Sequence, residues 1–313
     1  MHLVNPVTGE QIALPSVITI EQVTPLFDDS GVICKYQYSP HTAESVIGPT
    51  LALDLGMLRN YLQHKALLFY DTSAGSYIVV LIHGPWGQLS FARLGDKKWT
   101  WLPPHIDFED CIYKDGLLYA VTTFGEIIAF DLSRTVPTSK IIMGRTYKRS
   151  AGERVYIAQA PWGDLLQVRR PLVLIRERER IDEHGHSACA GRATTWKKNV
   201  RMEIYKVCTA TKKLVEINSL ADHVLFLGHN QSQCSRAEEY PQLKPNHIYF
   251  TDDSTLVYYK PKVGFRLVIG VLNFENKSVE EIIWPRPWSN CMAPLLIIPN
   301  LGMMDSACRS LRI

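Results

Sequence analysis

The side chains best suited to bind a metal gather in one short segment of the sequence. His184, His186 and Cys189 lie close together. A zinc site needs three or four ligands in a fixed geometry, and no fourth ligand follows at a conventional spacing. Asp252 and Asp253 form an acidic pair, but Asp is also a standard residue of tight turns. We therefore expect polar loops at both places and no metal site.

The sequence patterns that indicate catalysis or nucleotide binding do not occur in this chain. There is no Ser on a Gly-flanked elbow, no Cys with flanking glycines, no phosphate-binding Gly-rich loop and no P-loop Lys. The His and Asp residues are scattered without a spacing that would bring acids and bases together. We therefore expect no catalytic residues and no cofactor.

Tryptophans are the side chains that most invite a binding function. Trp86, Trp162, Trp284 and Trp288 each lie next to Pro or Gly, at the ends of expected strands. Indoles are common at the centres of protein interfaces, but they also fill the wedge between packed sheets. We favour packing between sheets for these residues. Trp86, Trp162 and Trp288 remain candidates for contacts with a partner.

The elements that must position these residues are short strands joined by turns. We expect three hairpins, each rich in β-branched or aromatic residues. They pair residues 66–70 with 77–83, 111–113 with 117–122, and 247–251 with 255–260. Asp115-Gly116 is a strong hairpin turn. Helical periodicity is almost absent, and the best helical candidate is the short stretch 219–226.

A strand–turn–strand pattern recurs four times, at residues 4–15, 93–103, 205–217 and 270–282. The tripeptide Pro-Trp-Gly occurs twice, around Trp86 and Trp162, at an interval that fits two units of about 40 residues, the length of a propeller blade. A propeller also protects the edges of many short strands. We predict an all-β propeller of about six or seven four-stranded blades, in preference to two or three β-sandwiches.

Two segments interrupt the strand pattern. Residues 176–199 alternate charges and carry few apolar side chains, so we expect a mobile, solvated loop within one blade. The arginines between Arg169 and Arg201 could contact an acidic partner, although a solvated loop explains them better. Residues 231–245 contain two prolines and indicate an ordered surface loop.

Composition excludes several classes of protein. The 313 residues carry a formal net charge of +3, which gives no electrostatic case for nucleic acid. The mean hydropathy of -0.06, and apolar runs far shorter than the roughly 20 residues of a bilayer helix, argue against a membrane protein. Seven scattered cysteines without a CxxC pair indicate reduced thiols. No secretory signal opens the chain, so we expect a cytoplasmic and/or nuclear location.

Several motifs together resemble plant F-box proteins that carry a DUF295 domain, also called the KIB1-4 β-propeller domain. They are the segments 5–15, 225–232, 240–253 and 270–276, and the pair Trp284-Pro285. The resemblance covers nearly the whole chain and implies a β-propeller with a recognition role. In that family an F-box docks on the Skp1 adaptor of a cullin-RING ubiquitin ligase, and the propeller presents the substrate.

The start of the chain departs from the pattern of that family. No helical F-box precedes Asn5, and we expect the first propeller strands of the family to be missing as well. We therefore expect a single propeller domain over residues 1–313 with an incomplete first blade, a protein substrate of unknown identity, and no binding of a Skp1-type adaptor. The leading function is non-catalytic protein recognition. A propeller enzyme or carbohydrate-binding lectin is one alternative, and a truncated family member without function is another.

Overall fold

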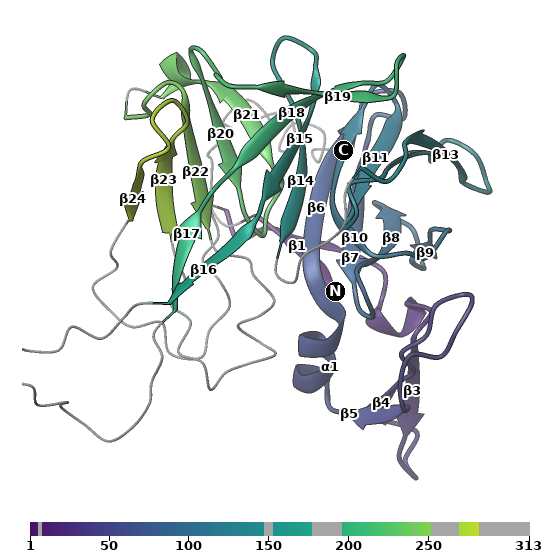
Figure 1. Cartoon of the computed structure of the whole chain (residues 1–313). Helices are drawn as coiled ribbons and strands as arrows, with labels where there is room; N and C mark the ends of the chain where they lie inside the picture. Colours follow the sequence, from purple (N-terminus) through teal and green to yellow (C-terminus); the bar gives the residue numbers. More distant parts are fainter. Residues whose placement is uncertain (6–7, 147–152, 177–195, 241, 252–268, 282–313) are drawn as a thin grey trace, which may run out of the picture.

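The computed structural model describes residues 1–5, 8–146, 153–176, 196–240, 242–251 and 269–281. These residues form short antiparallel sheets that follow one another along the chain (Figure 1). The first two sheets are small: β1 (His2–Val4) pairs with β2 (Gln11–Ala13), and β3 (Val23–Phe27), β4 (Ile33–Tyr38) and β5 (Leu51–Leu53) pair in that order. A short helix, α1 (Leu55–Leu62), and the 3-10 turn η1 (Val17–Thr19) accompany the second sheet.

Three four-stranded sheets follow. Their strands are β6 (Gln63–Asp71), β7 (Ser76–His83), β8 (Gln88–Arg93) and β9 (Thr100–Trp101); β10 (Phe108–Lys114), β11 (Leu117–Thr122), β12 (Ile127–Asp131) and β13 (Thr138–Met143); and β14 (Arg154–Gln159), β15 (Leu165–Arg170), β18 (Glu203–Cys208) and β19 (Lys213–Ile217). Between β15 and β18 the chain forms a separate two-stranded ladder, β16 (Leu172–Arg176) with β17 (Trp196–Val200).

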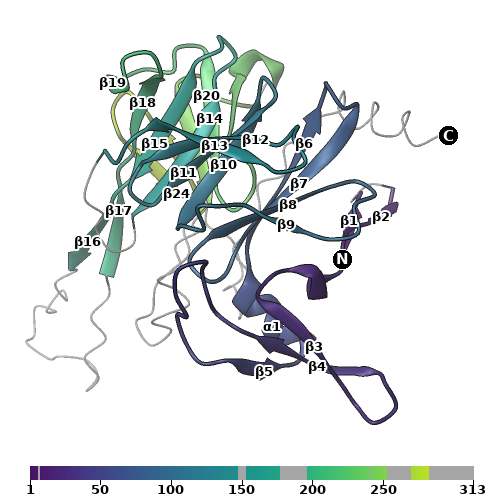
Figure 2. The ribbon, with the colours of Figure 1, turned by 90° about the vertical axis from the view of Figure 1, so that its right-hand side faces the viewer.

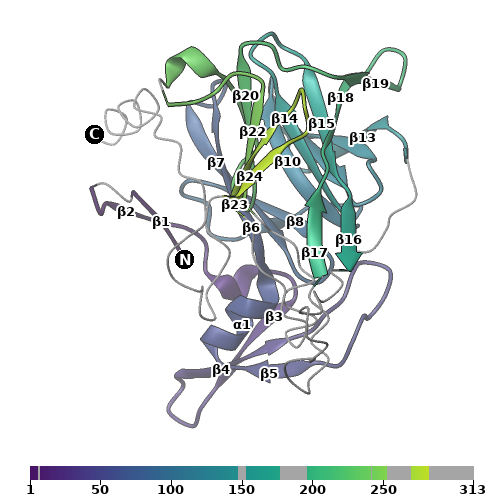
Figure 3. The same ribbon diagram turned by 60° about the vertical axis from the view of Figure 1, so that its left-hand side comes forward.

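The last described sheet has five strands. Its order is β21 (Gln233–Arg236), β20 (His223–Leu227), β22 (His247–Thr251), β23 (Ile269–Asn273) and β24 (Val279–Glu281), and the 3-10 turn η2 (Ala237–Glu239) follows β21. The pair of β20 with β22 is parallel, and the other pairs are antiparallel. Figure 3 brings this sheet forward, and Figure 2 shows the β1–β2 hairpin standing apart from the other sheets.

The hydrophobic core lies between consecutive sheets, which explains the sequence of the strands. β7 is buried at seven of its eight positions, as expected of a strand with packed sheets on both faces. One cluster joins Ile78 and Val80 to Leu118 and to Ile157 of the third four-stranded sheet. A second cluster joins that sheet to Leu225 and Phe250. Face-to-face packing of successive small sheets is the arrangement of propeller blades.

The strands β6, β10 and β14 form the inner edges of their sheets and run near one another in the middle of the molecule (Figure 1). β10 and β14 run in the same direction, because Glu109 pairs with Arg154 near their starts and Asp110 accepts a hydrogen bond from the Ile157 main chain further along. Each of these two strands therefore sends its final residues toward the same face of the propeller.

The all-β propeller prediction is confirmed, and so are the expected hairpins at 66–83 and 111–122 and all four recurrent strand–turn–strand segments. The tripeptides around Trp86 and Trp162 fall in sheets separated by one intervening sheet, as the two-blade interval predicted. The number of blades stays a prediction, because residues 252–268 and 282–313 lie outside the described residues.

Residues 255–260 of the third expected hairpin lie outside the described residues, and β22 pairs with β20 and β23. Three local predictions were wrong. Residues 219–226 form no helix, because their apolar residues enter the buried strand β20, and the described helix is α1 instead. The expected loop 231–245 contains β21. Arg169 and Arg170 belong to β15 and pack over the rings of Tyr205 and Phe250.

Candidate functional site

Trp86 and Trp162 are exposed, so the expectation that they pack between sheets was wrong. Trp86 is 58% exposed and Trp162 is 46% exposed. The turn that carries Trp86 meets the start of β10, because Gly87 O accepts a hydrogen bond from Phe108 N at 3.0 Å. The turn of Trp162 follows β14 at the opposite end. The two indoles therefore lie on opposite faces of the propeller, and Trp288 lies outside the described residues.

The Trp162 side chain is held in one orientation by its neighbours. Its Nε1–H donates to Asp164 Oδ2 at 2.8 Å, and that carboxylate also pairs with Lys206 Nζ at 2.9 Å. The indole packs edge-on against the ring of His223, with the centroids 4.7 Å apart. An aromatic side chain that is already ordered loses little conformational entropy when a partner binds it.

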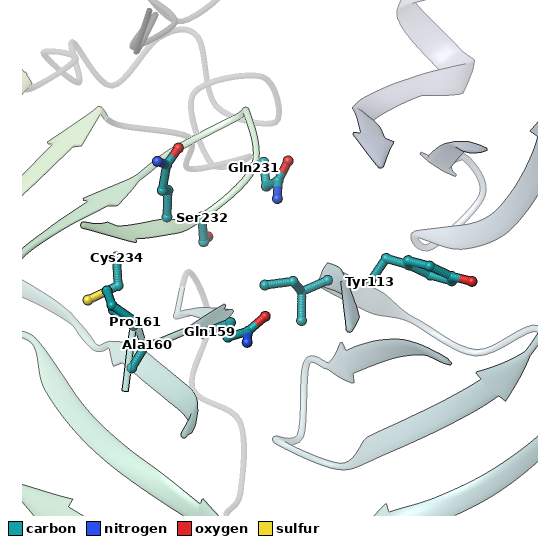
Figure 4. A pocket seen from close by; sticks show the side chains of 9 residues that line it. Tyr113, Gln159, Ala160, Pro161, Gln231, Ser232 and Cys234 are labelled. Carbon is teal, nitrogen blue, oxygen red and sulfur yellow. The ribbon is translucent and has the colours of Figure 1, made fainter. Parts of the chain in front are cut away.

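A cleft of about 240 Å³ lies beside the Trp162 turn. It is lined by Ile112 and Tyr113 at the end of β10, by residues 159–161 at the end of β14, and by residues 231–234 before and within β21. Three sheets thus contribute to one cleft, and the adjoining residue of the chain, Trp162, is exposed. Figure 4 shows Gln231, Ser232 and Gln159 around the cleft, with the Tyr113 ring pointing away from the other labelled residues.

A buried polar cluster next to the cleft ties the inner strands together. Asp110 is fully buried and pairs with Lys65 Nζ of β6 at 2.7 Å. Its other carboxylate oxygen accepts hydrogen bonds from Ser232 Oγ at 2.6 Å and from Ile157 N at 3.2 Å. Asp110 therefore fixes the position of Ser232, one of the residues that line the cleft.

The titratable groups at the cleft are kept neutral. Burial raises the pKa of the Cys234 thiol to about 12. Burial, followed by the charge of Asp71 and a hydrogen bond to it, raises the pKa of Tyr113 to about 12. Burial also raises the pKa of Cys111, in the strand that ends at the cleft, well above its ordinary value. A thiol that stays protonated is a poor nucleophile, so Cys234 contributes packing surface to the cleft.

The metal candidates from the sequence cannot be located. His184, His186, Cys189, Asp252 and Asp253 all lie outside the described residues. Within the described ranges, no group of three or more His, Cys, Asp or Glu side chains could hold a metal ion. In the same part of the chain, no helix is both long and apolar enough to cross a membrane.

The expected charged loop is only partly described. Arg176 ends β16 and Trp196 begins β17, so both ends of the stretch 176–199 are paired strands. Residues 177–195 lie outside the described residues, and the mobility of this loop stays a prediction.

Sequence reasoning missed most of the cleft. Tyr113, Gln159 and Gln231 come from segments far apart in the chain, and nothing in their local sequence marks them as neighbours. One signal was present: Gln231 and Ser232 belong to the stretch that most resembles the DUF295 family, and the second Pro-Trp-Gly tripeptide adjoins the cleft.

Comparisons with known proteins agree with this architecture. The family model described as KIB1-4 beta-propeller matches residues 1–272. The Arabidopsis thaliana protein named "Putative F-box protein At5g55150" is 25% identical over 294 residues, which cover 92% of this chain and 69% of that relative. A propeller shared with a protein of that name supports a role in protein interaction in general. The match over most of its length shows that the chain belongs to the KIB1-4 beta-propeller family.

Proposed function

We propose that this propeller is a non-catalytic recognition module of the kind used by SCF-type ubiquitin ligases, and that the cleft beside Trp162 receives a segment of the substrate protein. The observation that carries the proposal is an ordered, exposed indole next to a cleft built from three sheets. The few residues that contribute most of the binding energy of an interface, its hot spots, are enriched in Trp and lie in well-packed pockets. The Cys234 thiol in the cleft, whose pKa burial raises to about 12, favours binding over chemistry.

The ligase context is supported by the relative, whose printed name describes an F-box protein. The docking of an F-box on a Skp1-type adaptor would join such a propeller to the ligase. We assign substrate contact to the face with Trp162 and no adaptor contact to residues 1–313. We place the protein in the cytoplasm and/or nucleus, in keeping with the free cysteines of the described residues, Cys34, Cys111, Cys208 and Cys234.

Site-specific photo-crosslinking tests the proposed face. A photoreactive phenylalanine analogue replaces Trp162 in one version of the chain and Trp86 in the other, and both are expressed in plant cells. We expect discrete protein adducts from position 162 that position 86 does not give. With a partner identified in this way, Trp162→Ala should weaken binding by about 30-fold or more, the effect of an interface hot spot. Equal adducts from the two positions would contradict the assignment.

A further inference from the structure

The three strands that border the cleft are all edge strands. β10, β14 and β21 each stand at the end of their sheet and pair with one neighbour only, which is β11, β15 and β20 respectively. An edge strand presents main-chain N–H and C=O groups on its open side, and such groups readily pair with another chain. The direction of these groups at the cleft follows from the hydrogen bonds of each strand.

Two hydrogen bonds show which side of β14 the main-chain groups of each residue face. Ile157 N–H donates to the Asp110 side chain on the open side of the strand, whereas Ala160 N–H donates to Asp164 O on the side of β15. Main-chain groups of an antiparallel strand alternate between the two sides. Gln159 therefore directs its N–H and C=O toward the open side, where the cleft lies.

The same alternation applies to the other two strands. Cys111 N–H donates to the Asp110 side chain, away from β11, so Tyr113, two residues later, also faces the open side. Ala237 N–H donates to Asp222 O and therefore faces β20. Cys234 lies three residues earlier in the alternation, so its main-chain groups face away from β20. Within the described part of the chain, the main-chain groups of Tyr113, Gln159 and Cys234 have no hydrogen-bond partner on their open sides.

The lining of the cleft is polar but carries no charged side chain. Amides come from Gln159, Gln231 and Gln233, and the remaining lining is hydroxyl, thiol, apolar or main chain. A charged ligand would lose its hydration there without an ion pair in return, which is costly. The cleft is also smaller than the roughly 300–1,000 Å³ of pockets that enclose a drug-sized molecule, so it fits part of a longer ligand.

We infer that the cleft binds an extended, uncharged peptide segment that pairs as an added strand with the open edge of β14, between the open edges of β10 and β21, with an apolar side chain of the peptide against Trp162. This inference rests on the proposed function and names the class of substrate segment that the site takes. An extended peptide carries alternating donors and acceptors, which are the groups that open strand edges can pair. The site thus excludes phosphorylated, strongly acidic and chain-terminal segments.

A phage-displayed library of random 12-residue peptides, selected on the full chain, tests this inference. We expect enriched peptides with an uncharged core that contains an aromatic, aliphatic or Pro residue. A synthetic copy of one enriched peptide is then N-methylated at one amide at a time. In strand addition only alternate amides face the protein, so methylation should weaken binding about tenfold or more at alternate positions and have little effect between them.

Protein variants locate the same peptide on the structure. Trp162→Ala should weaken its binding at least tenfold, whereas Trp86→Ala, on the opposite face, should leave it unchanged. Gln159→Pro removes the open-edge N–H, and Pro is tolerated on edge strands; Gln159→Ala keeps that N–H as the matched control. We expect the Pro variant to bind the peptide about tenfold less tightly than the Ala variant. The N-methylation series gives an independent reading if Gln159→Pro does not fold.

Several outcomes would overturn the inference. They are the absence of any enriched peptide, enrichment of charged cores, equal effects of methylation at every amide, and equal losses from Trp162→Ala and Trp86→Ala. The photo-crosslinking result separates this failure from failure of the proposed function. If protein adducts form at position 162 while peptides fail, the face still binds proteins but does not take an extended, uncharged strand. If neither result appears, both proposals fail.

Discussion

Asp110 shows how a single side chain can link three parts of the propeller and support the candidate site. Its carboxylate lies between Lys65 of β6, Ile157 of β14 and Ser232 of the segment before β21. A buried ion pair is costly to break, because the remaining partner stays buried without compensation. The position of Ser232 at the cleft therefore depends on a charge that the solvent does not reach.

We expect Asp110→Ala to lower the free energy of unfolding by about 3–5 kcal/mol, the usual effect of removing one member of a buried pair. The control is Glu280→Ala, which removes an exposed ion pair with Lys244 at 3.4 Å and should cost about 0–1 kcal/mol. Urea unfolding followed by circular dichroism measures both variants. If Asp110→Ala costs no more than Glu280→Ala, the buried pair does not hold the inner strands together.

His83 makes the stability of the molecule depend on pH. The ring is buried, with Nδ1 next to Gly84 O at 2.8 Å and Nε2 next to Ser90 Oγ at 2.8 Å. Burial lowers the pKa of His83 from 6.5 to about 4. Between these values the unfolded chain binds a proton that the folded chain does not bind, so stability falls as the pH decreases from 6.5 to 4.

The contribution of His83 to this loss should be about 3 kcal/mol, at about 1.4 kcal/mol per unit of pKa difference. Urea unfolding at several pH values measures it. His83→Gln cannot titrate, so its stability should fall less steeply over the same range, whatever its stability at pH 7. Equal slopes for the variant and the original protein would show that His83 titrates normally in the folded state.

At the scale of elements, the two Pro-Trp-Gly turns place the same tripeptide in different surroundings. Both glycines have positive φ values, +69° at Gly87 and +95° at Gly163. A Cβ atom at Gly87 would lie 2.3 Å from Phe108 O, whereas a Cβ at Gly163 would meet no atom within 4 Å. Gly87 is therefore required both by its conformation and by the close approach of β10, and Gly163 by its conformation alone.

These two glycines form a matched pair of test positions. Gly163→Ala should cost about 1–2 kcal/mol of stability, the strain of a positive φ at a residue with a side chain. Gly87→Ala should cost about 1–3 kcal/mol more, because the added methyl group forces β10 away. Thermal or urea unfolding of the two variants gives the comparison. Equal losses would mean that the turn before β8 can shift away from β10 without cost.

The elements also show how much of this fold the sequence alone predicts. Hairpins such as β10–β11 were predicted because their turn residues and β-branched strands are local in the chain. The pairing of β20 with β22 was not predicted, because it is parallel and spans an intervening strand. The helix α1 was missed, because Gly56 and Asn60 weaken its helix propensity and tertiary packing of Leu58 and Leu62 stabilises it.

The candidate site was less predictable than the strands. Trp162 was a weak candidate in the sequence, and its exposure depends on which end of β14 carries the turn. The cleft beside it forms where β10 and β14 end and β21 begins, and this depends on the packing of three sheets. Neither the open edges of these strands nor the buried carboxylate next to the cleft has a local sequence pattern. A site built between blades, as this one is, can therefore be identified only from the structure.

At the scale of the whole molecule, recognition and adaptor docking require different surfaces. The propeller presents strand ends, a cleft and an exposed indole. An F-box presents an apolar surface formed by helices, of the kind that docks in a groove of its partner. Among the described residues, the helix α1 turns Leu58 and Leu62 into the core against the second and third sheets, and β1 and β2 near the start of the chain form a hairpin.

Residues 1–313 alone should therefore not bind a Skp1-type adaptor, because the described helix α1 spans only eight residues and packs Leu58 and Leu62 into the core. A pull-down with purified adaptor measures this, with the full-length Arabidopsis relative as the matched control. We expect the adaptor to bind the relative and not this chain. Micromolar or tighter binding of the adaptor by residues 1–313 would show that the propeller itself carries an adaptor surface. Substitution of exposed residues on α1, beginning with Met57→Ser, would then be the first step in locating that surface.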